Sequence, residues 1–271
     1  MEVSLENIRN DIRMRNKSDR QMSSAWLLVY FLPIIVGVVS AGYTVVYMLN
    51  FVSSIDPLTP TFNYSYDEFA TRFAMPLFII GLNGLINFVM SISFTYLLVN
   101  RRSTHFKRQK FLSEDIMATI NSLAKTKKVE MEASLSPIER AVREANVEEI
   151  EKSAILWAVL SAFVPFVQWY VFYFLMNDFY NHEHREDSFW EDLGRVMNKL
   201  GINFSVPQRT KSMPDRSFVL YLILTIITAS LFGVYWFYAL LKDPNEHFKH
   251  HIETENQLLT ALKSVAVKEQ L

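Results

Sequence analysis

The sequence predicts an all-α integral membrane protein with four transmembrane helices, arranged as two repeated hairpins with cytoplasmic helical extensions. Three observations lead to this fold class: four long windows contain no Asp, Glu, Lys or Arg, the segments between them have helical periodicity, and one stretch of the chain repeats another. The formal net charge of −1 gives no reason to expect a nucleic-acid partner. The chain has no Cys, which excludes disulfides and thiolate-bound metals.

The uncharged windows are each long enough to cross a bilayer. A helix needs roughly 20 apolar residues to cross a hydrocarbon core of about 30 Å. Buried helices of soluble proteins are usually amphipathic and shorter, so that alternative is disfavoured. The windows comprise Gln21 to Ile55, Phe73 to Asn100, Ser153 to Asn177 and Ser217 to Leu241, and the expected spans cover about 24–52, 73–99, 153–176 and 217–241.

Basic residues near the spans predict the orientation. Five Lys or Arg residues precede the first span, and five more follow the second. The positive-inside rule therefore places both termini and the central loop in the cytoplasm, at the cell membrane. Residues 178–216 hold six basic residues, yet four spans require this loop to lie outside together with residues 56–72. Glycosylation sequons at Asn63 and Asn203 fall in these two outer loops.

Self-comparison of the chain predicts an internal duplication. Tyr96 to Ala124 aligns without gaps on Tyr238 to Ala266, and the seven identical pairs include His105 and His247. A repeat in a membrane chain usually means two equivalent units packed about an axis. We therefore expect two hairpin units, each with two spans and a cytoplasmic tail helix, over residues 1–128 and 136–271.

The last span carries a family resemblance in three short motifs. These are Ile226-Ile227-Thr228, Tyr235-Trp236-Phe237-Tyr238, and the polar set Asp243, Asn245 and His247. In this pattern the chain resembles an uncharacterised prokaryotic membrane family built on short transmembrane hairpins, here duplicated. The resemblance covers about the last fifth of the chain and implies no established activity.

Amphipathic helices are predicted outside the lipid. Residues 105–125 place apolar side chains at steps of three and four, which is the pattern of a helix with one buried face. Residues 188–200 form a short helix whose side chains Phe189, Trp190 and Leu193 are expected to lie at the membrane interface. The tail helices either pack on the chain's own helices or pair with other chains, so a homo-oligomer or an assembly with other membrane subunits is expected.

Histidine is the candidate metal ligand. His247 and His251 are four residues apart and Glu255 follows one turn later, which aligns three potential ligands on one helix face. His182 and His184 form a second cluster, in the expected outer loop, with the residue types that bind a divalent ion. The alternative is that these histidines are solvated or interfacial. No bound cofactor is required by the sequence.

The polar residues within the spans are few and uncharged. Asn83 and Asn87 share a face of the second span, and Gln168 lies in the third. We expect them to join helices by hydrogen bonds, and the alternative is that they line a polar pore. No ionisable side chain lies in the middle of a span, which argues against a proton-coupled pump.

These observations favour a non-catalytic multi-pass membrane protein that serves as a structural or accessory subunit, or as the scaffold, of a membrane assembly. One alternative is an oligomeric channel or small-solute transporter that uses the Asn83 and Asn87 face. A second alternative is a membrane enzyme that holds a metal ion by histidines. No Gly-rich phosphate loop and no Ser-His-Asp or Cys-His grouping is found, so no catalytic residue is assigned.

Overall fold

The computed structural model describes residues 2–53 and 66–269, and every secondary-structure element in these ranges is a helix. The all-α prediction is therefore confirmed for that part of the chain. The sequon at Asn63 lies outside the described residues. The helices are α1 (Glu2–Ser18), α2 (Trp26–Ser53), α3 (Tyr66–Lys127), α4 (Glu132–Glu148), α5 (Ala154–Phe163), α6 (Val167–Lys199), α7 (Phe218–Ile227) and α8 (Leu231–Glu269).

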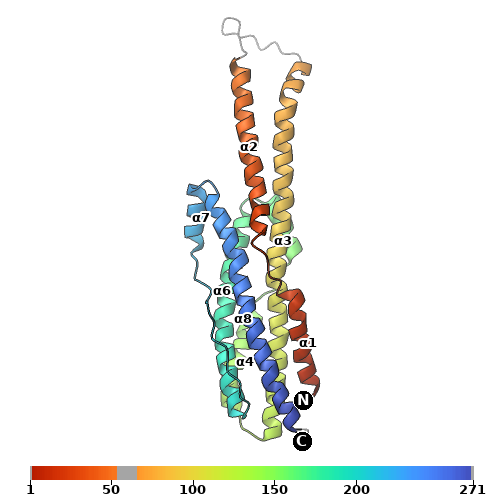
Figure 1. Ribbon diagram of the computed structural model, residues 1–271, viewed down its shortest axis with the longest axis vertical. Helices are drawn as coiled ribbons and strands as arrows, with labels where there is room; N and C mark the ends of the chain where they lie inside the picture. The colour runs from red at the N-terminus through yellow and green to blue at the C-terminus, as the bar shows by residue number, and fades with distance from the viewer. Residues whose placement is uncertain (1, 54–65, 270–271) are drawn as a thin grey trace.

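Helix α2 and the first half of α3 form the end of the elongated molecule that lies away from the chain termini, which we call the tall end (Figure 1). Both helices are long and apolar enough to cross a membrane, as the sequence predicts for the first two spans. Only 6% of the most apolar window of each helix is buried inside the protein. Side chains such as Leu28 (76% exposed) and Val38 (69% exposed) contact little of the chain, so lipid is their natural solvent.

The third uncharged window folds as a helical hairpin and not as one span. Helix α5 has only 10 residues, and α6 begins after a turn at residues 164–166. Pro165 lies in this turn, and Phe166 has a left-handed backbone with a φ of 67°. Proline removes a helix hydrogen bond, and a left-handed residue cannot extend a right-handed helix. Trp157 of α5 then packs against Phe174 of α6, which confirms that the chain folds back on itself.

The fourth window breaks in the same way. Helix α7 has 10 residues, and Ala229 and Ser230 in the turn that follows have φ angles of 48° and 73°. Tyr221 of α7 packs edge-on against Trp236 of α8, with 5.7 Å between ring centroids. A ten-residue helix rises only about 15 Å, which is half of a hydrocarbon core of about 30 Å. The third and fourth windows are therefore not continuous spans, and the four-span arrangement is not confirmed.

The described chain contains three hairpins, α2–α3, α5–α6 and α7–α8, and each ends in a long helix that runs towards the termini (Figure 1). The predicted boundary between units falls at the connection of α3 and α4. The second unit, however, holds two hairpins instead of one. The duplication itself stays a prediction.

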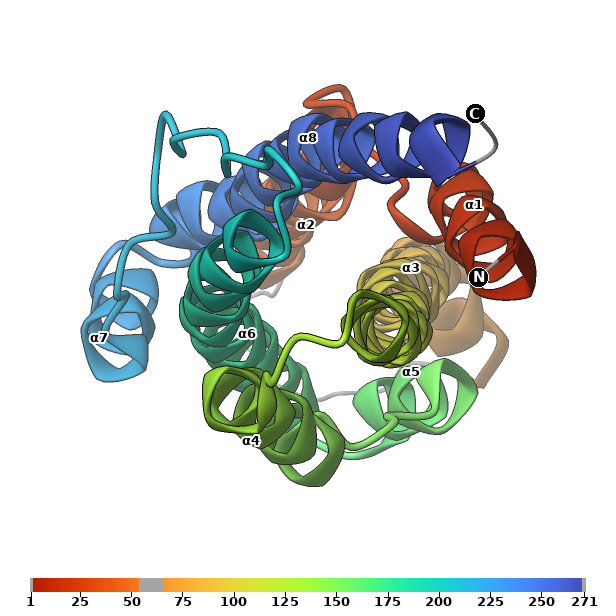
Figure 2. The same ribbon diagram turned by 90° about the horizontal axis from the view of Figure 1, so that it is seen from below.

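The lower halves of α3, α6 and α8 pack with α1 and α4 into a helical bundle around the chain termini (Figures 1 and 2). The stripe predicted on α3 lies in its core, where Leu112 and Ile116 are 0% and 1% exposed. Ile8 of α1, Ile138 of α4 and Leu258 of α8 belong to the same apolar cluster. This part of the molecule has the ordinary core of a water-soluble helical domain.

The apolar row near the end of α6 lies inside this bundle. Phe189, Trp190 and Leu193 are 7%, 2% and 0% exposed and join the same cluster. The interfacial helix expected over residues 188–200 is therefore wrong, because this stretch continues α6 and its apolar face is covered by α3 and α4.

Residues 178–216 lie on the same side of the molecule as the termini. The Nζ atom of Lys127 donates to the carbonyl of Leu200 at 2.8 Å, and Lys199 Nζ donates to Ser134 Oγ at 3.0 Å. The prediction that put this loop and the central loop on opposite sides of a membrane is wrong, because the two segments touch.

Candidate metal centre

Four histidines meet in the bundle, just below the apolar half of α3. His105 comes from α3, His182 from α6, and His247 and His251 from α8. Each is at most 2% exposed, and one potential ligand atom from each lies within 4.8 Å of the others. Buried imidazoles in such a group need either a common ion or hydrogen bonds that separate them.

The Nε2 atoms of the four rings point at one another. His105 Nε2 lies 3.2 Å from His182 Nε2 and 3.2 Å from His247 Nε2, and His251 Nε2 lies 3.0 Å from His247 Nε2. Two imidazole nitrogens bound at right angles to one ion, each at about 2.1 Å, lie about 3.0 Å apart. The spacing of the four nitrogens therefore matches the edges of a coordination shell.

Glu186 adds a carboxylate to the same point. It lies one helical turn after His182 on α6, and its Oε1 is 3.2 Å from His182 Nε2. Its Oε2 is 2.6 Å from His251 Nε2 and 3.4 Å from His247 Nε2. Both oxygens thus face the space that the four ring nitrogens surround.

The outward Nδ1 atoms of the four histidines all have a carboxylate within 3.5 Å. His105 Nδ1 lies 2.9 Å from Asp19, in the connection between α1 and α2. His182 Nδ1 lies 2.7 Å from Glu149 at the end of α4. A carboxylate accepts the Nδ1 proton, so the Nε2 lone pair is left free to bind an ion.

The two histidines of α8 have different partners. His247 Nδ1 lies 3.0 Å from Glu183 on α6. His251 Nδ1 lies 2.5 Å from the amide nitrogen of Gln109, which can only donate, and 3.5 Å from Glu255, the carboxylate that can accept an Nδ1 proton. Such outer partners fix the orientation of metal-binding imidazoles in proteins.

Arginines neutralise the carboxylates behind the histidines. Arg108 binds Asp19 at 2.6 Å and Glu255 at 2.8 Å, and all three side chains are almost completely buried. Arg209 binds Glu183 at 3.0 Å. These ion pairs offset the charge of Asp19, Glu255 and Glu183, while burial raises the pKa of Glu183 above its usual value.

The charge state of the four rings is uneven. Burial lowers the pKa of His105 to about 4, and burial together with His251 lowers the pKa of His247 well below its usual value. Burial also opposes the charged form of His182, but Glu149 and Glu186 raise its pKa to about 10. Glu186 likewise raises the pKa of His251, to about 9. Two neutral and two protonated rings at such short distances are costly, and a cation that replaces the two protons removes the cost.

The structure brings together the two predicted histidine clusters and leaves two of their members out. His247, His251 and His182 lie in the centre. Glu255 lies behind His251 and faces Arg108, and His184 is exposed, with its Nδ1 3.2 Å from the carbonyl of Tyr180.

Sequence reasoning grouped Glu186 with His182 and His184 as a neighbour able to bind a divalent ion, but did not bring it to the histidines of α8. It also assigned no ligand role to His105, the repeat partner of His247. One local signal was present, because His182 and Glu186 have the same spacing of four as His247 and His251. That signal was obscured because α6 was expected on the opposite side of the membrane.

The polar residues of the apolar half lie apart from this centre. Asn87 Nδ2 donates to the carbonyl of Asn83 one turn earlier, at 2.8 Å. Gln168 Oε1 accepts a hydrogen bond from Thr95 at 2.7 Å, which joins α6 to α3. Asn87 and Gln168 also line a cavity between α2, α3, α5 and α6.

No protein family, no curated protein and no solved structure matches this chain.

Proposed function

We propose that the chain is a membrane-anchored metalloprotein that binds one first-row transition-metal ion through His105, His182, Glu186, His247 and His251. The observation that carries the proposal is the convergence of four Nε2 atoms and one carboxylate on a single buried point. Imidazole and carboxylate ligands bind such ions, and the outer carboxylates supply the support that these ligands need.

Iron(II) is the ion that this donor set fits best. Four imidazole nitrogens and two carboxylate oxygens offer six donors, whereas zinc sites in proteins almost always use four. The chain has no Cys, so the thiolates that favour copper(I) and many zinc sites are missing. Imidazole nitrogens are good ligands for iron(II), whereas magnesium and calcium are bound by oxygen ligands.

The site has the character of an accessory or electron-carrying centre. Catalytic metal sites keep a coordination position open for substrate, and structural sites are closed. With both oxygens of Glu186 bound, no position remains. The ion would then join three hairpins, since its ligands come from α3, α6 and α8. This agrees with the accessory role favoured by the sequence, and the channel alternative stays a prediction.

Metal analysis of purified protein tests the proposal. We expect about one iron per chain after anaerobic purification in mild detergent, and His247→Ala should reduce this at least tenfold. His184→Ala is the matched control, because His184 is exposed and lies only two residues from His182. A wild-type chain that retains no transition metal after reconstitution with iron(II), manganese(II) or zinc(II) would contradict the proposal.

Metal removal should also destabilise the bundle. An ion present at about 1,000 times its Kd stabilises a protein by about 4 kcal/mol, which corresponds to a Tm shift of about 10 °C for a chain of this size. We expect a chelator to lower the Tm of the wild-type protein by about this amount. The Tm of His247→Ala should not respond, and an equal response of both proteins would mean that the chelator acts elsewhere.

A further inference from the structure

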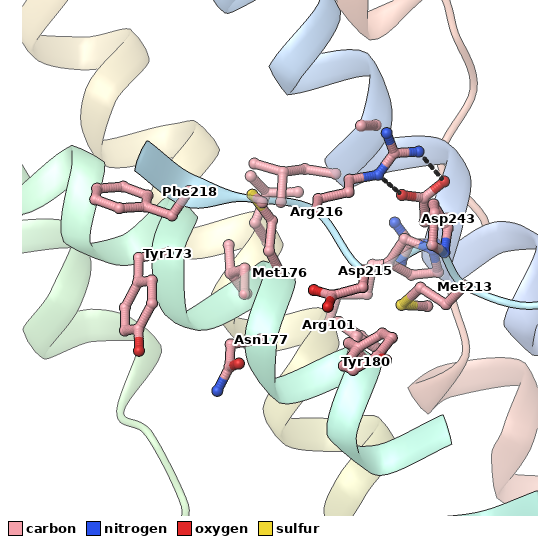
Figure 3. Close-up of a pocket in the computed structure, with 17 residues that line it drawn as sticks. Arg101, Tyr173, Met176, Asn177, Tyr180, Met213, Asp215, Arg216, Phe218 and Asp243 are labelled. Carbon is pink, nitrogen blue, oxygen red and sulfur yellow. Dashed lines mark hydrogen bonds and ion pairs between the residues drawn. The ribbon is translucent and has the colours of Figure 1, made fainter. Parts of the chain in front are cut away.

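A cavity of about 80 Å³ lies between α3, α6, α8 and the segment that precedes α7 (Figure 3). This is several times the roughly 10–15 Å³ that one water molecule needs. The cavity is next to the metal centre but does not include its ligands. Phe179, which lines the cavity, packs against the ring of His105 at 6.2 Å between centroids.

Arg101 lines the cavity, and its guanidinium lies over the ring of Phe248, 4.8 Å from the centroid, with Asp19 near enough to attract it but not in ion-pair contact. Its side chain is 3% exposed. Nη1 donates to the carbonyl of Leu241 at 3.2 Å, and Nη2 donates to the side-chain oxygen of Asn245 at 2.5 Å, so both acceptors are neutral. The Nε atom is buried and has no hydrogen-bond partner. Within the described residues, no carboxylate forms an ion pair with Arg101.

The neighbouring arginines lack this property. Arg102, the next residue on α3, pairs with Asp178 at 2.9 Å. Arg108, two turns later, pairs with Asp19 and Glu255. A buried guanidinium that is left without an anion is costly, so Arg101 is the position at which an external anion would be stabilised.

The other charged groups of the cavity do not supply that anion. Asp243 is held by Arg216, at 2.7 Å and 3.1 Å. Asp215 lines the cavity, but its side chain is exposed to solvent, which screens its charge. Neither acid is paired with Arg101.

The cavity changes character along its length. Figure 3 shows Arg101, Tyr180 and Asp215 towards one end and the rings of Tyr173 and Phe218 at the other. Tyr173 is 42% exposed, on the apolar stretch of α6. The polar end therefore suits a charged group, and the aromatic end suits a hydrocarbon chain.

The cavity also lies beside the end of the apolar stretch of α3. Arg101 directly follows the uncharged window of α3, which ends at Asn100. On the other side, α7 presents exposed apolar side chains such as Val219 (62%) and Leu220 (51%). Basic residues at the ends of apolar helices meet the phosphates of the bilayer.

We propose that this cavity binds one phospholipid, with its phosphate against Arg101 and the start of an acyl chain along Tyr173 and Phe218. Arginine matches phosphate oxygens geometrically with its fork of N–H donors. The site does not depend on the metal ion, so it can be tested separately from the proposed function.

Lipid retained by purified protein is the measurement. We expect about one phospholipid per chain to survive exchange into lipid-free detergent, as counted by native mass spectrometry. Arg101→Gln, which keeps a polar side chain but removes the charge, should lower retention at least tenfold. Lys107→Gln is the control, because Lys107 is exposed on the same helix and does not line the cavity; it should retain lipid as the wild type does.

A second variant guards against a failure of Arg101→Gln to fold. Ala239 of α8 is buried and lines the cavity, so Ala239→Met fills it and leaves Arg101 in place. This variant should also lose the lipid. Retention that is unchanged in both variants overturns the proposal.

A test with inorganic phosphate distinguishes a bound phospholipid from a bound free anion. In delipidated protein, vesicles that contain phospholipid should raise the Tm of the wild type, and Arg101→Gln should need a higher lipid concentration for the same protection. Inorganic phosphate alone should leave the Tm unchanged. If inorganic phosphate protects as well as vesicles do, the site binds a free anion and the lipid proposal is wrong. Iron content, measured on the same samples, should be equal in all variants and so keeps this test independent of the metal centre.

Discussion

The two halves of α3 have opposite surroundings although they belong to one continuous helix. In the first half only 6% of the most apolar window is buried, and Leu77 and Phe78 are both 64% exposed. In the second half Leu112 and Ile120 are at most 1% exposed, and charged residues such as Arg108 are buried with partners. The exposed apolar side chains of the first half suit an apolar solvent, whereas the second half buries its apolar side chains inside the protein.

The difference teaches where polar chemistry can be built in this fold. Four imidazoles and their carboxylates require a rigid protein surrounding that supplies hydrogen bonds from several elements. The bundle supplies α1, α4, α6 and α8 around α3, whereas the apolar half of α3 contacts mainly α2 and α5. The histidine cluster lies in this part of α3, where His105 is completely buried.

Side-specific labelling gives the largest expected contrast between the two regions. The chain has no Cys, so each introduced cysteine is unique. Ser188→Cys on α6 and Thr260→Cys on α8 should react with an impermeant maleimide from one side of sealed membranes. Tyr66→Cys, at the tall end of α3 and 85% exposed, should react from the other side. If Ser188→Cys and Tyr66→Cys reacted from the same side, the result would support the four-span prediction instead.

Leucine truncation on the two halves of α3 should differ in size. Leu112→Ala removes a completely buried side chain and should lower the free energy of unfolding by about 3 kcal/mol. Leu77→Ala removes an exposed side chain from the same helix and should change it by less than about 0.5 kcal/mol. Denaturant titration in mild detergent measures both. Equal losses would mean that the tall end is also packed against protein.

The bundle should also show a pH dependence that the apolar end lacks. Burial and the neighbouring Asp115 raise the pKa of Asp11 to about 7, from a usual value of 3.8. The folded state therefore favours protonated Asp11, and the stability gained from it is full below about pH 4 and is lost as the pH rises to 7.

Asp11→Asn removes this loss. We expect it to stabilise the protein by about 1 kcal/mol at pH 8, and this gain should shrink towards pH 4. The expected gain is smaller than the free energy that corresponds to the whole pKa shift, because the site is open to water. Thermal unfolding at pH 8 and pH 5 measures it. Glu253→Gln, on an exposed position of α8, should have little effect at either pH. If the gain for Asp11→Asn did not depend on pH, the pair of carboxyl groups of Asp11 and Asp115 would be excluded as its source.

The smallest expected effect is at a hairpin turn. Ser230 has a φ of 73°, which glycine adopts without strain, so Ser230→Gly should stabilise the protein by about 0.5–1 kcal/mol. Ser264→Gly, within α8, should destabilise it by a similar amount. The two changes on neighbouring stretches of chain should therefore have opposite signs in the same unfolding assay.

Local periodicity was enough to predict the helices and much of the core. The stripe on residues 105–125 is buried as its spacing indicates, because apolar side chains on one face must leave water. Hydropathy did not predict the helical hairpins in the third and fourth windows, because one continuous span and two shorter helices joined by a turn can have the same composition. Pro165 did not settle the matter in advance, because proline also occurs within transmembrane helices.

The metal centre depends on contacts that no local pattern contains. His247 and His251 are recognisable by their spacing, but His105 is 77 positions from His182 and 142 positions from His247. Their meeting follows from the hairpins that return α6 and α8 to the side of the termini. The prediction that residues 178–216 lie across the membrane from the central loop was therefore sufficient to separate one cluster into two.

The order of the ligands along the chain has a consequence for biogenesis. The first proposed ligand is His105 and the last is His251, so the proposed coordination shell is incomplete until the chain has been synthesised into α8 and the helices α3, α6 and α8 have packed together. Chains that are truncated or wrongly inserted would hold only part of the shell and bind the ion weakly. Occupancy by the ion would thus distinguish fully assembled molecules from defective ones, before any partner engages them.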